Sequence, residues 1–160
     1  MLEIDGSYGE GGGQLVRTAV ALSAITGHPV AIHNVRASRD KPGLAPQHVA
    51  AVRAVAALAG AGAEGVRLRS PSISFSPRAL AGGSFRFDVG TAGSVTLLLQ
   101  ALLPVMIASG KPCDAAVIGG TDVRMAPPLD YLREVLLALL SRMGAHVRLE
   151  VRRRGYYPRG

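Results

Sequence analysis

The chain has 160 residues and a formal net charge of +7, and 16 of its 18 basic residues are arginines, whose planar guanidinium suits phosphate-bearing partners. Only 4% of the residues are aromatic and none is tryptophan, so base-stacking platforms are scarce and alanine, valine and leucine must build the core. The single cysteine excludes an internal disulfide, no basic-then-apolar leader is visible, and the longest apolar stretch is short of a membrane span, so we expect a cytoplasmic protein without a membrane partner.

In chain order, the periodicity of the first half predicts a strand, a helix, a strand, a second helix and two short strands. These elements cover residues 2–5, 13–26, 30–36, 46–59, 66–69 and 73–76. Gly27 and Pro29 end the first helix, and the second helix begins at Pro46 and ends before Gly60.

The same order then begins again, after roughly 80 residues. The second set predicts a strand, a helix, a strand, a helix and a strand over residues 84–89, 93–108, 114–118, 128–143 and 146–152. No counterpart of the last strand of the first set follows. We therefore predict an α+β fold of two consecutive βαβαββ units, residues 1–80 and 81–160, with the helices packed on one face of the sheet. The second unit is truncated before its last strand, so we interpret the chain as a fragment.

A glycine-rich loop joins the first strand to the first helix. Its sequence, Gly6-Ser7-Tyr8-Gly9-Glu10-Gly11-Gly12-Gly13-Gln14, lacks the Gly-Lys-Ser/Thr of a Walker A motif. Glycines permit close backbone approach, and the start of a helix offers N–H groups to an anion. Glu10 is an oxygen ligand for a hard cation, and Gln14 and Arg17 lie near the same helix end, which favours a metal–phosphate site. A plain tight turn is the alternative.

A second loop concentrates cations before the second helix. Arg36, Arg39 and Lys41 fall within six positions and lead to Gln47-His48, which suits a polyphosphate clamp, with a solvated basic loop as the alternative. We expect Arg69 and Arg78, around the strand hairpin, to lie outside this site.

Two further loops precede the helices of the second set. Gly90-Thr91-Ala92-Gly93-Ser94 opens a helix that is almost wholly apolar except for Gln100. A buried glutamine needs partners, either backbone groups or a nucleotide base or sugar. Gly119-Gly120-Thr121-Asp122 precedes Ala126-Pro127-Pro128, whose prolines could form a rigid apolar wall. The four histidines do not have metal-ligand spacing.

These motifs, taken in order, resemble the RNA 3'-terminal phosphate cyclase family over essentially the whole chain. The matching residues are Gly9 to Gln14 with Arg17, Arg36 to Leu44 with Gln47-His48, Gly93-Ser94 with Gln100, Gly119 to Asp122 with Ala126 to Pro128, and Gly155-Tyr156-Tyr157-Pro158. Val123 departs from the family, which often has asparagine there, and this puts a polar contact from position 123 in doubt.

The resemblance implies an ATP-dependent enzyme that uses a divalent metal, magnesium or manganese. Members of the family adenylylate an active-site histidine, pass AMP to the 3'-phosphate of RNA, and release AMP as the 2'-hydroxyl closes a 2',3'-cyclic phosphate. Their main domain repeats a βαβαββ unit three times, carries a smaller inserted domain and is related in architecture to the enolpyruvyl transferases.

The resemblance also assigns residues. It makes Glu10 a ligand of ATP and of the metal, and it places Gln100 and Pro127 along the adenosine pocket. The phosphate and RNA-end site would contain Gln14, Arg17, Arg36, Arg39 and Gln47, with Lys41 and His48 beside them. The nucleophilic histidine is expected beyond residue 160, so the chain would hold no catalytic residue, would be inactive alone, and would act with its own carboxy-terminal half.

Two alternatives remain. The loop from Gly90 to Ser94 resembles the Asn-Ala-Gly-Thr loop of the enolpyruvyl transferases, but the arginine that those enzymes need soon afterwards is absent. Non-catalytic relatives of the cyclases bind RNA during ribosomal RNA processing, and Glu10 with the Arg36, Arg39 and Lys41 loop favours an enzyme over such a protein.

Overall fold

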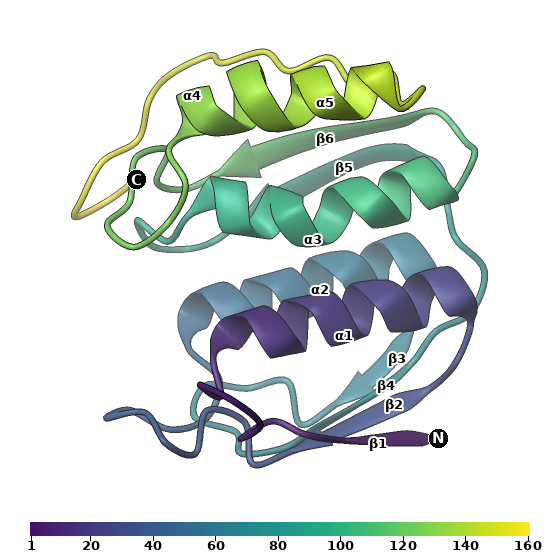
Figure 1. Cartoon of the computed structure of the whole chain (residues 1–160), viewed down its shortest axis with the longest axis vertical. Coiled ribbons are helices and arrows are strands. Elements are labelled where there is room, and N and C mark those ends of the chain that lie inside the picture. Colours follow the sequence, from purple (N-terminus) through teal and green to yellow (C-terminus); the bar gives the residue numbers. More distant parts are fainter.

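A four-stranded sheet is built from the first half of the chain, in the order β1-β2-β4-β3 (Figure 1). The computed structural model describes all 160 residues. The strands are β1 (Leu2–Asp5), β2 (Val30–His33), β3 (Gly62–Glu64) and β4 (Ile73–Ser76). β2 is parallel to β1 and antiparallel to β4, whereas β3 pairs only with β4. β4 therefore joins β3 to the rest of the sheet, and its Phe75 is fully buried.

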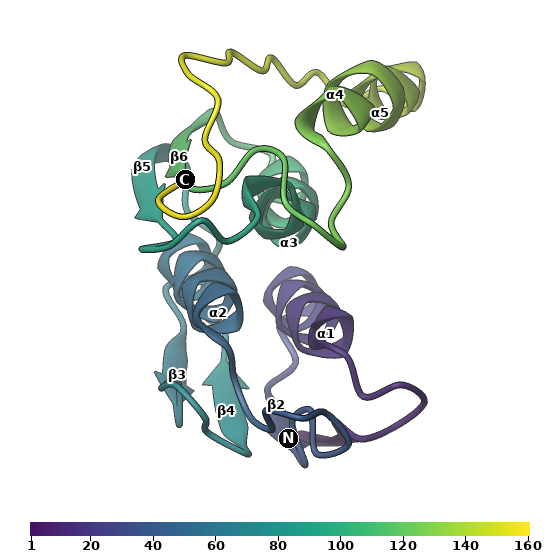
Figure 2. The same cartoon turned by 90° about the vertical axis from the view of Figure 1, so that its left-hand side faces the viewer.

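Two helices cover one face of this sheet (Figure 2). They are α1 (Gly13–Thr26) and α2 (Pro46–Ala59), with the bounds that the sequence predicts. Each ends at a glycine in the left-handed conformation, Gly27 with φ 74° and Gly60 with φ 52°, because a side chain there would be strained. Their inner faces are small and apolar and pack on the sheet and on each other.

The second half repeats the strand–helix–strand order. β5 (Gly83–Asp88) pairs in parallel with β6 (Cys113–Ile118), and α3 (Val95–Ala108) connects them. The side chain of Ser94 caps α3 by accepting the N–H of Leu97 at 3.2 Å. α3 lies against both α1 and α2, and a single core cluster of 21 buried residues runs through the three helices and the first sheet.

A final helical segment covers α4 (Leu129–Tyr131), a π-helical turn (Leu132–Leu136) and α5 (Leu137–Arg142). The helix predicted over 128–143 is thus confirmed, apart from the π turn. Leu132 and Leu137 pack against Leu103 of α3 in a second, smaller cluster. None of the helices combines the length and the apolarity that a bilayer crossing requires.

The strand predicted over 66–69 is wrong. The strand that pairs with β4 comes earlier, at 62–64, and the connection between them contains a turn at Leu68 and Arg69. The alternation of Val66 and Leu68 is misleading because Leu68 is 57% exposed. β2 also stops at His33 instead of residue 36, since Asn34 and Arg36 take positive φ angles of 51° and 54°.

The strand predicted over 146–152 does not form either, because this segment pairs with no strand. Its alternation is real, since Val147 and Leu149 pack partly against the second cluster. In the first unit the corresponding strand, β3, pairs only with β4. No counterpart of β4 occurs among the 160 residues, so residues 146–152 have no strand with which to form backbone hydrogen bonds.

Candidate functional site

The loops that carry the sequence motifs gather at one end of the molecule, on the left in Figure 1. A parallel strand–helix–strand connection places the carboxyl ends of the strands and the amino ends of the helices on the same side. β1, β2, β5 and β6 therefore all deliver their loops to the starts of α1, α2, α3 and α4 (Figure 1). Helix amino termini carry partial positive charge and unpaired N–H groups, so this end favours anions.

The glycine loop, residues 6–12, is shaped by close backbone approach. The N–H of Gly6 donates to the carbonyl of His33 at 2.7 Å, and a Cβ on Gly6 would lie 2.6 Å from that oxygen. Gly9 and Gly11 have φ angles of 62° and 54°, which suit glycine. Gly12 caps α1 without any side-chain hydrogen bond, so no capping side chain accepts the first N–H groups of the helix.

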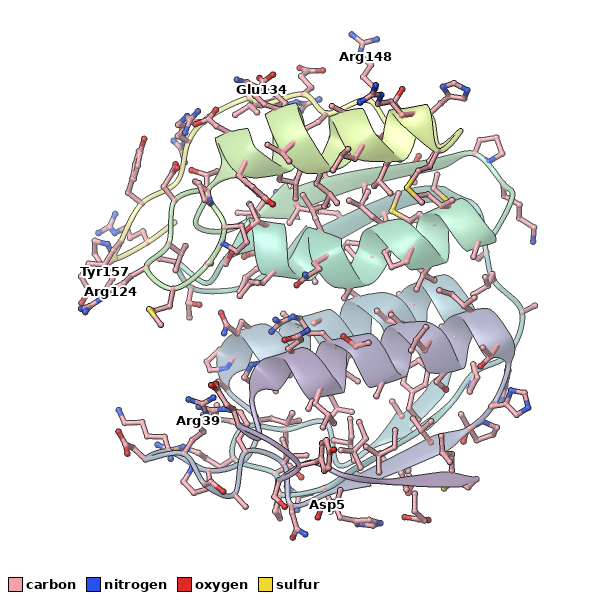
Figure 3. The ribbon with its side chains drawn as sticks, in the orientation of Figure 1. Asp5, Arg39, Arg124, Glu134, Arg148 and Tyr157 are labelled. Carbon is pink, nitrogen blue, oxygen red and sulfur yellow. The ribbon has the colours of Figure 1, made fainter.

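Arg39 reaches from the second loop to the first. We call residues 34–44 the arginine loop. The Nη2 of Arg39 donates to Oε2 of Glu10 at 3.2 Å, and a Cβ on Gly12 would lie 3.5 Å from the same nitrogen. The guanidinium therefore stands at the amino end of α1, and Figure 3 shows it among the loops at that end. Glu10 is 92% exposed, so its carboxylate faces solvent.

Arg36 organises the arginine loop from within. Its Nη1 donates to the carbonyl oxygens of Lys41 at 2.9 Å and Gly43 at 2.8 Å. No carboxylate pairs with it. Burial, followed by repulsion from Arg39 and Arg69, lowers the pKa of Arg36. An anion would relieve that repulsion. Lys41 is exposed and contributes only its carbonyl to the loop.

Arg17 is the buried cation of the site. It lies on α1, is 7% exposed, and its Nε has no hydrogen-bond partner within the protein. Burial lowers its pKa. A buried guanidinium donor without a partner is costly unless an anion satisfies it, so Arg17 is a strong candidate for a phosphate contact.

His48 connects two helices instead of facing solvent. It is 3% exposed, and its Nδ1 accepts the N–H of Ala45 at 3.0 Å. Burial, then the charges of Arg36 and Arg17, lowers its pKa to about 4. The ring is therefore neutral at physiological pH, and its place under the first residue of α1 suits a positioning role.

The other predicted residues are distributed around this centre. Glu10 and Gln14 line an open pocket of about 580 Å³, which runs from Tyr8 along the outer face of α1 to Leu22. Gln47, at the start of α2, lies against the loop before α3. A Cβ built on Gly93 would be 3.4 Å from the Cβ of Gln47.

Gln100 lies on α3, and Pro127 is bonded to the same helix. Thr96 of α3 donates its Oγ1 hydrogen to the carbonyl of Pro127 at 2.7 Å. Gln100 follows Thr96 by four residues and therefore occupies the same helix face one turn on. Both Gln100 and Pro127 are exposed, so the expectation that Gln100 is a buried amide is wrong, whereas a contact with a nucleotide base or sugar stays a prediction.

Arg154 was not singled out in the sequence, yet it holds the loop that carries Pro127. Its Nη1 donates to both oxygens of Asp122 at 3.1 and 3.2 Å, and its Nη2 to both oxygens of Asp130 at 2.6 and 2.7 Å. Hydrogen bonds to Asp130 and Asp122 raise the pKa of Arg154, and the bond from Arg154 lowers that of Asp130. Thr121 adds backbone and side-chain hydrogen bonds to Gly155. We call these contacts the Arg154 clasp.

Arg69 was expected to lie outside the site, yet its loop packs against the arginine loop. Residues 65–72, here the hairpin loop, connect β3 to β4 and lie along the arginine loop. The N–H of Leu44 donates to the carbonyl of Ser70 at 3.1 Å, and the N–H of Arg69 to the carbonyl of Leu44 at 2.9 Å. A Cβ on Gly43 would lie 2.9 Å from Cα of Arg69. Local sequence gave only the cation itself as a signal, because the contact is tertiary.

A metal at this end would depend on the substrate for most of its ligands. No group of three or more histidine, cysteine, aspartate or glutamate side chains is placed to hold a cation. A single exposed carboxylate, Glu10, fits magnesium, which proteins often bind through one or two carboxylates together with substrate phosphates.

The model of one protein family, RNA 3'-terminal phosphate cyclase, matches residues 8–160. The RNA 3'-terminal phosphate cyclase of Nitrosospira multiformis is 61% identical over 160 residues, which are 100% of this chain and 45% of that protein. Those of Archaeoglobus fulgidus and Methanopyrus kandleri are 52% and 54% identical over the whole chain, which covers 49% and 46% of their lengths. The chain thus spans about half the length of these curated relatives.

Proposed function

Since this chain belongs to the RNA 3'-terminal phosphate cyclase family, we propose that its full-length protein uses ATP to convert an RNA 3'-phosphate into a 2',3'-cyclic phosphate. The observation that carries the proposal is the unpartnered Nε of buried Arg17. The charges of Arg17 and Arg36 both lower the pKa of His48, so both cations lie near this ring, at the end where several helices begin.

The reaction is a sequence of phosphorus transfers. A histidine nitrogen attacks the α-phosphorus of ATP and pyrophosphate leaves. An oxygen of the RNA 3'-phosphate then attacks the phosphorus of the enzyme-bound AMP and the histidine leaves. Finally the 2'-hydroxyl attacks the 3'-phosphorus, loses its proton, and AMP leaves. Each step moves charge onto phosphate oxygens, so cations and helix termini stabilise the transition states.

This chain supplies the binding groups of that sequence. Arg17 and Arg39 bind phosphate oxygens at the start of α1, and Arg36 keeps the arginine loop in shape. Gln14, on α1, and Gln47, on α2, donate amide hydrogens to the phosphates. Lys41 adds charge at the rim, and His48 positions the first turn of α1.

Gln100 and Pro127 hold the adenosine, which is why the Arg154 clasp matters to nucleotide affinity. Glu10 would hold the divalent metal, magnesium or manganese, which neutralises charge on the phosphates when bound.

The nucleophilic histidine is assigned to the remainder of the protein. His48 is buried and its Nδ1 already accepts a hydrogen bond. His33 pairs with Glu3 across β1 and β2. His28 follows the end of α1 and His146 follows the end of α5, away from the helix starts.

The test uses full-length protein, ATP labelled in its α-phosphate, and RNA with a labelled 3'-phosphate. We expect a labelled protein band and an RNA end that becomes resistant to phosphatase. Residues 1–160 alone should give no labelled band. RNA binding by the full-length protein without either product would instead indicate a non-catalytic RNA-binding relative, and labelling of residues 1–160 alone would place the nucleophile within this chain.

A further inference from the structure

We propose that Arg69, together with the hairpin loop that presents it, binds the phosphodiester backbone of the RNA upstream of its 3'-terminal phosphate. The inference rests on the proposed function and names a contact beyond the terminal-phosphate site. It is carried by the backbone of Arg69, by the packing of its loop, and by its uncompensated charge.

Arg69 occupies a backbone position that ordinarily goes to glycine. The N–H of Ser70 donates to the carbonyl of Arg67 at 3.1 Å, so residues 67–70 form a turn whose third residue is Arg69. That residue has φ 64°, a conformation in which glycine or asparagine is favoured and a long side chain is strained. A residue other than glycine held in such a conformation is grounds for proposing a use for its side chain.

Arg36 repeats this geometry in the neighbouring loop. The N–H of Ala37 donates to the carbonyl of Asn34 at 3.1 Å, which makes Arg36 the third residue of a second turn, with φ 54°. The two turns lie side by side, because the N–H of Val35 donates to the carbonyl of Pro71 at 2.9 Å. Two arginines with positive φ angles therefore occupy adjacent loops.

The charge of Arg69 has no counter-ion within the chain. It forms no ion pair with any acidic side chain, and neither does Arg67 in the same loop. Arg69 is exposed and repels Arg36. A polyanion that lies across both loops would interact favourably with both charges.

The position of the hairpin loop favours RNA over ATP as that polyanion. The candidate adenosine residues, Gln100 and Pro127, lie on α3 and the loop after β6, whereas the hairpin loop lies at the foot of the first sheet (Figure 2). A nucleotide whose adenosine is held at Gln100 would approach Arg17 and Arg39 with its phosphates from the side of the second unit. An RNA end whose terminal phosphate reaches Arg17 can leave over Arg36 and Arg69 on the opposite side.

The test compares full-length wild type with Arg69→Gly, Arg69→Lys and Arg78→Ala, the last being an exposed arginine outside the arginine loop and the hairpin loop. The probes are a fluorescent ten-nucleotide RNA with a 3'-phosphate and a nucleoside 3'-phosphate as competitor. We expect Arg69→Gly to melt no lower than wild type, since glycine relieves the strain. Its affinity for the ten-nucleotide RNA should fall about tenfold, with a shallower salt dependence by about 0.7.

Arg69→Lys should keep most of the affinity and Arg78→Ala all of it, while the nucleoside 3'-phosphate should bind every variant equally. Unchanged affinity of Arg69→Gly for the long RNA would overturn the inference, and so would an equal loss for the nucleoside 3'-phosphate. Binding needs no catalysis, so the expected pattern in a protein that never becomes adenylylated would support this RNA contact and reject the proposed function.

Discussion

The imidazole ring of His48 fills the space into which a side chain at position 13 would extend. A Cβ built on Gly13 would lie 2.6 Å from both Cδ2 and Cε1 of the ring, well inside van der Waals contact. The first residue of α1 can therefore only be glycine while His48 occupies its place at the start of α2. This contact ties the glycine loop to the helix that follows the arginine loop.

The first prediction follows from that contact. Gly13→Ala should destabilise the full-length protein even though alanine is the better helix former by about 1 kcal/mol, because the ring has no room to move within a buried site. Gly12→Ala is the matched control, since its Cβ would meet nothing closer than 3.5 Å. Thermal melting gives the comparison. The double variant Gly13→Ala/His48→Ala should recover part of the loss, and equal melting of the two single variants would contradict the overlap.

The second prediction concerns acid stability. The folded pKa of His48 is about 4, below the ordinary value of 6.5. Below pH 6.5 the unfolded chain takes up a proton that the folded protein does not, so stability falls as the pH drops towards 4. Between pH 7.5 and 5 the contribution of His48 to this loss is about 2 kcal/mol.

Urea denaturation at both pH values measures this loss. His48→Asn, which keeps an acceptor for the N–H of Ala45, should lose less stability than wild type over the same interval. His146→Asn, at an exposed position, should behave as wild type does. Identical pH dependence in all three proteins would show that His48 titrates normally.

Glu10 gives the third prediction. Glu10→Gln preserves shape and removes the charge that a hard cation prefers. The full-length variant should fold normally but need much more magnesium or manganese for adenylylation. The measurement is the adenylylation rate against metal concentration, with the melting temperature as the folding control. An unshifted metal curve would reduce Glu10 to a loop residue whose one contact is with Arg39.

The fourth prediction concerns Arg39. Arg39→Ala should lower the rate of cyclisation roughly 10- to 100-fold, since a hydrogen bond to a charged group contributes about 1.5–3 kcal/mol. Arg78→Ala is the control, because Arg78 is an exposed cation outside the arginine loop and the glycine loop. Steady-state cyclisation of a short 3'-phosphate RNA compares them. Similar rates for both variants would move the phosphate site away from the start of α1.

The fifth prediction concerns the Arg154 clasp. Arg154→Met should loosen the loop with Pro127 and raise the KM for ATP more than it lowers kcat, with a lower melting temperature. Arg133→Met is the control, since Arg133 also contacts Asp130 but at 3.2 Å and from an exposed position. A double-mutant cycle of Arg154→Met with Asp130→Asn should show strong coupling. Additive effects in that cycle would mean that the two side chains act independently.

Most helices were predictable because their signals are local. α1 and α2 carry their own periodicity and stop signals, and the structure reproduces both ranges. The strands over residues 66–69 and 146–152 failed for a different reason: alternation shows that a segment can be a strand, but pairing requires a partner elsewhere in the chain. The π turn at 132–136 could not be predicted, because the pattern of apolar residues there does not differ from that of an ordinary α-helix.

The candidate site divides in the same way. Glu10, Arg36 and Arg39 could be found from loop composition and resemblance, and the structure brings them to one end of the molecule. The places of Arg69 and Arg154 could not be found, because each depends on contacts between segments far apart in the sequence. The burial of His48 and the exposure of Gln100 were equally hidden, since both depend on how α2 and α3 are oriented.

The strand order of the first sheet also sets a sequence of events during synthesis. Residues 62–64 leave the ribosome before their only strand partner, residues 73–76, so β3 cannot pair until β4 has emerged. When β4 arrives it inserts between β2 and β3, buries Phe75, and draws the hairpin loop onto the arginine loop. The first sheet, and the contact between the two loops that carry Arg36 and Arg69, therefore cannot be complete before residue 76 has been synthesised.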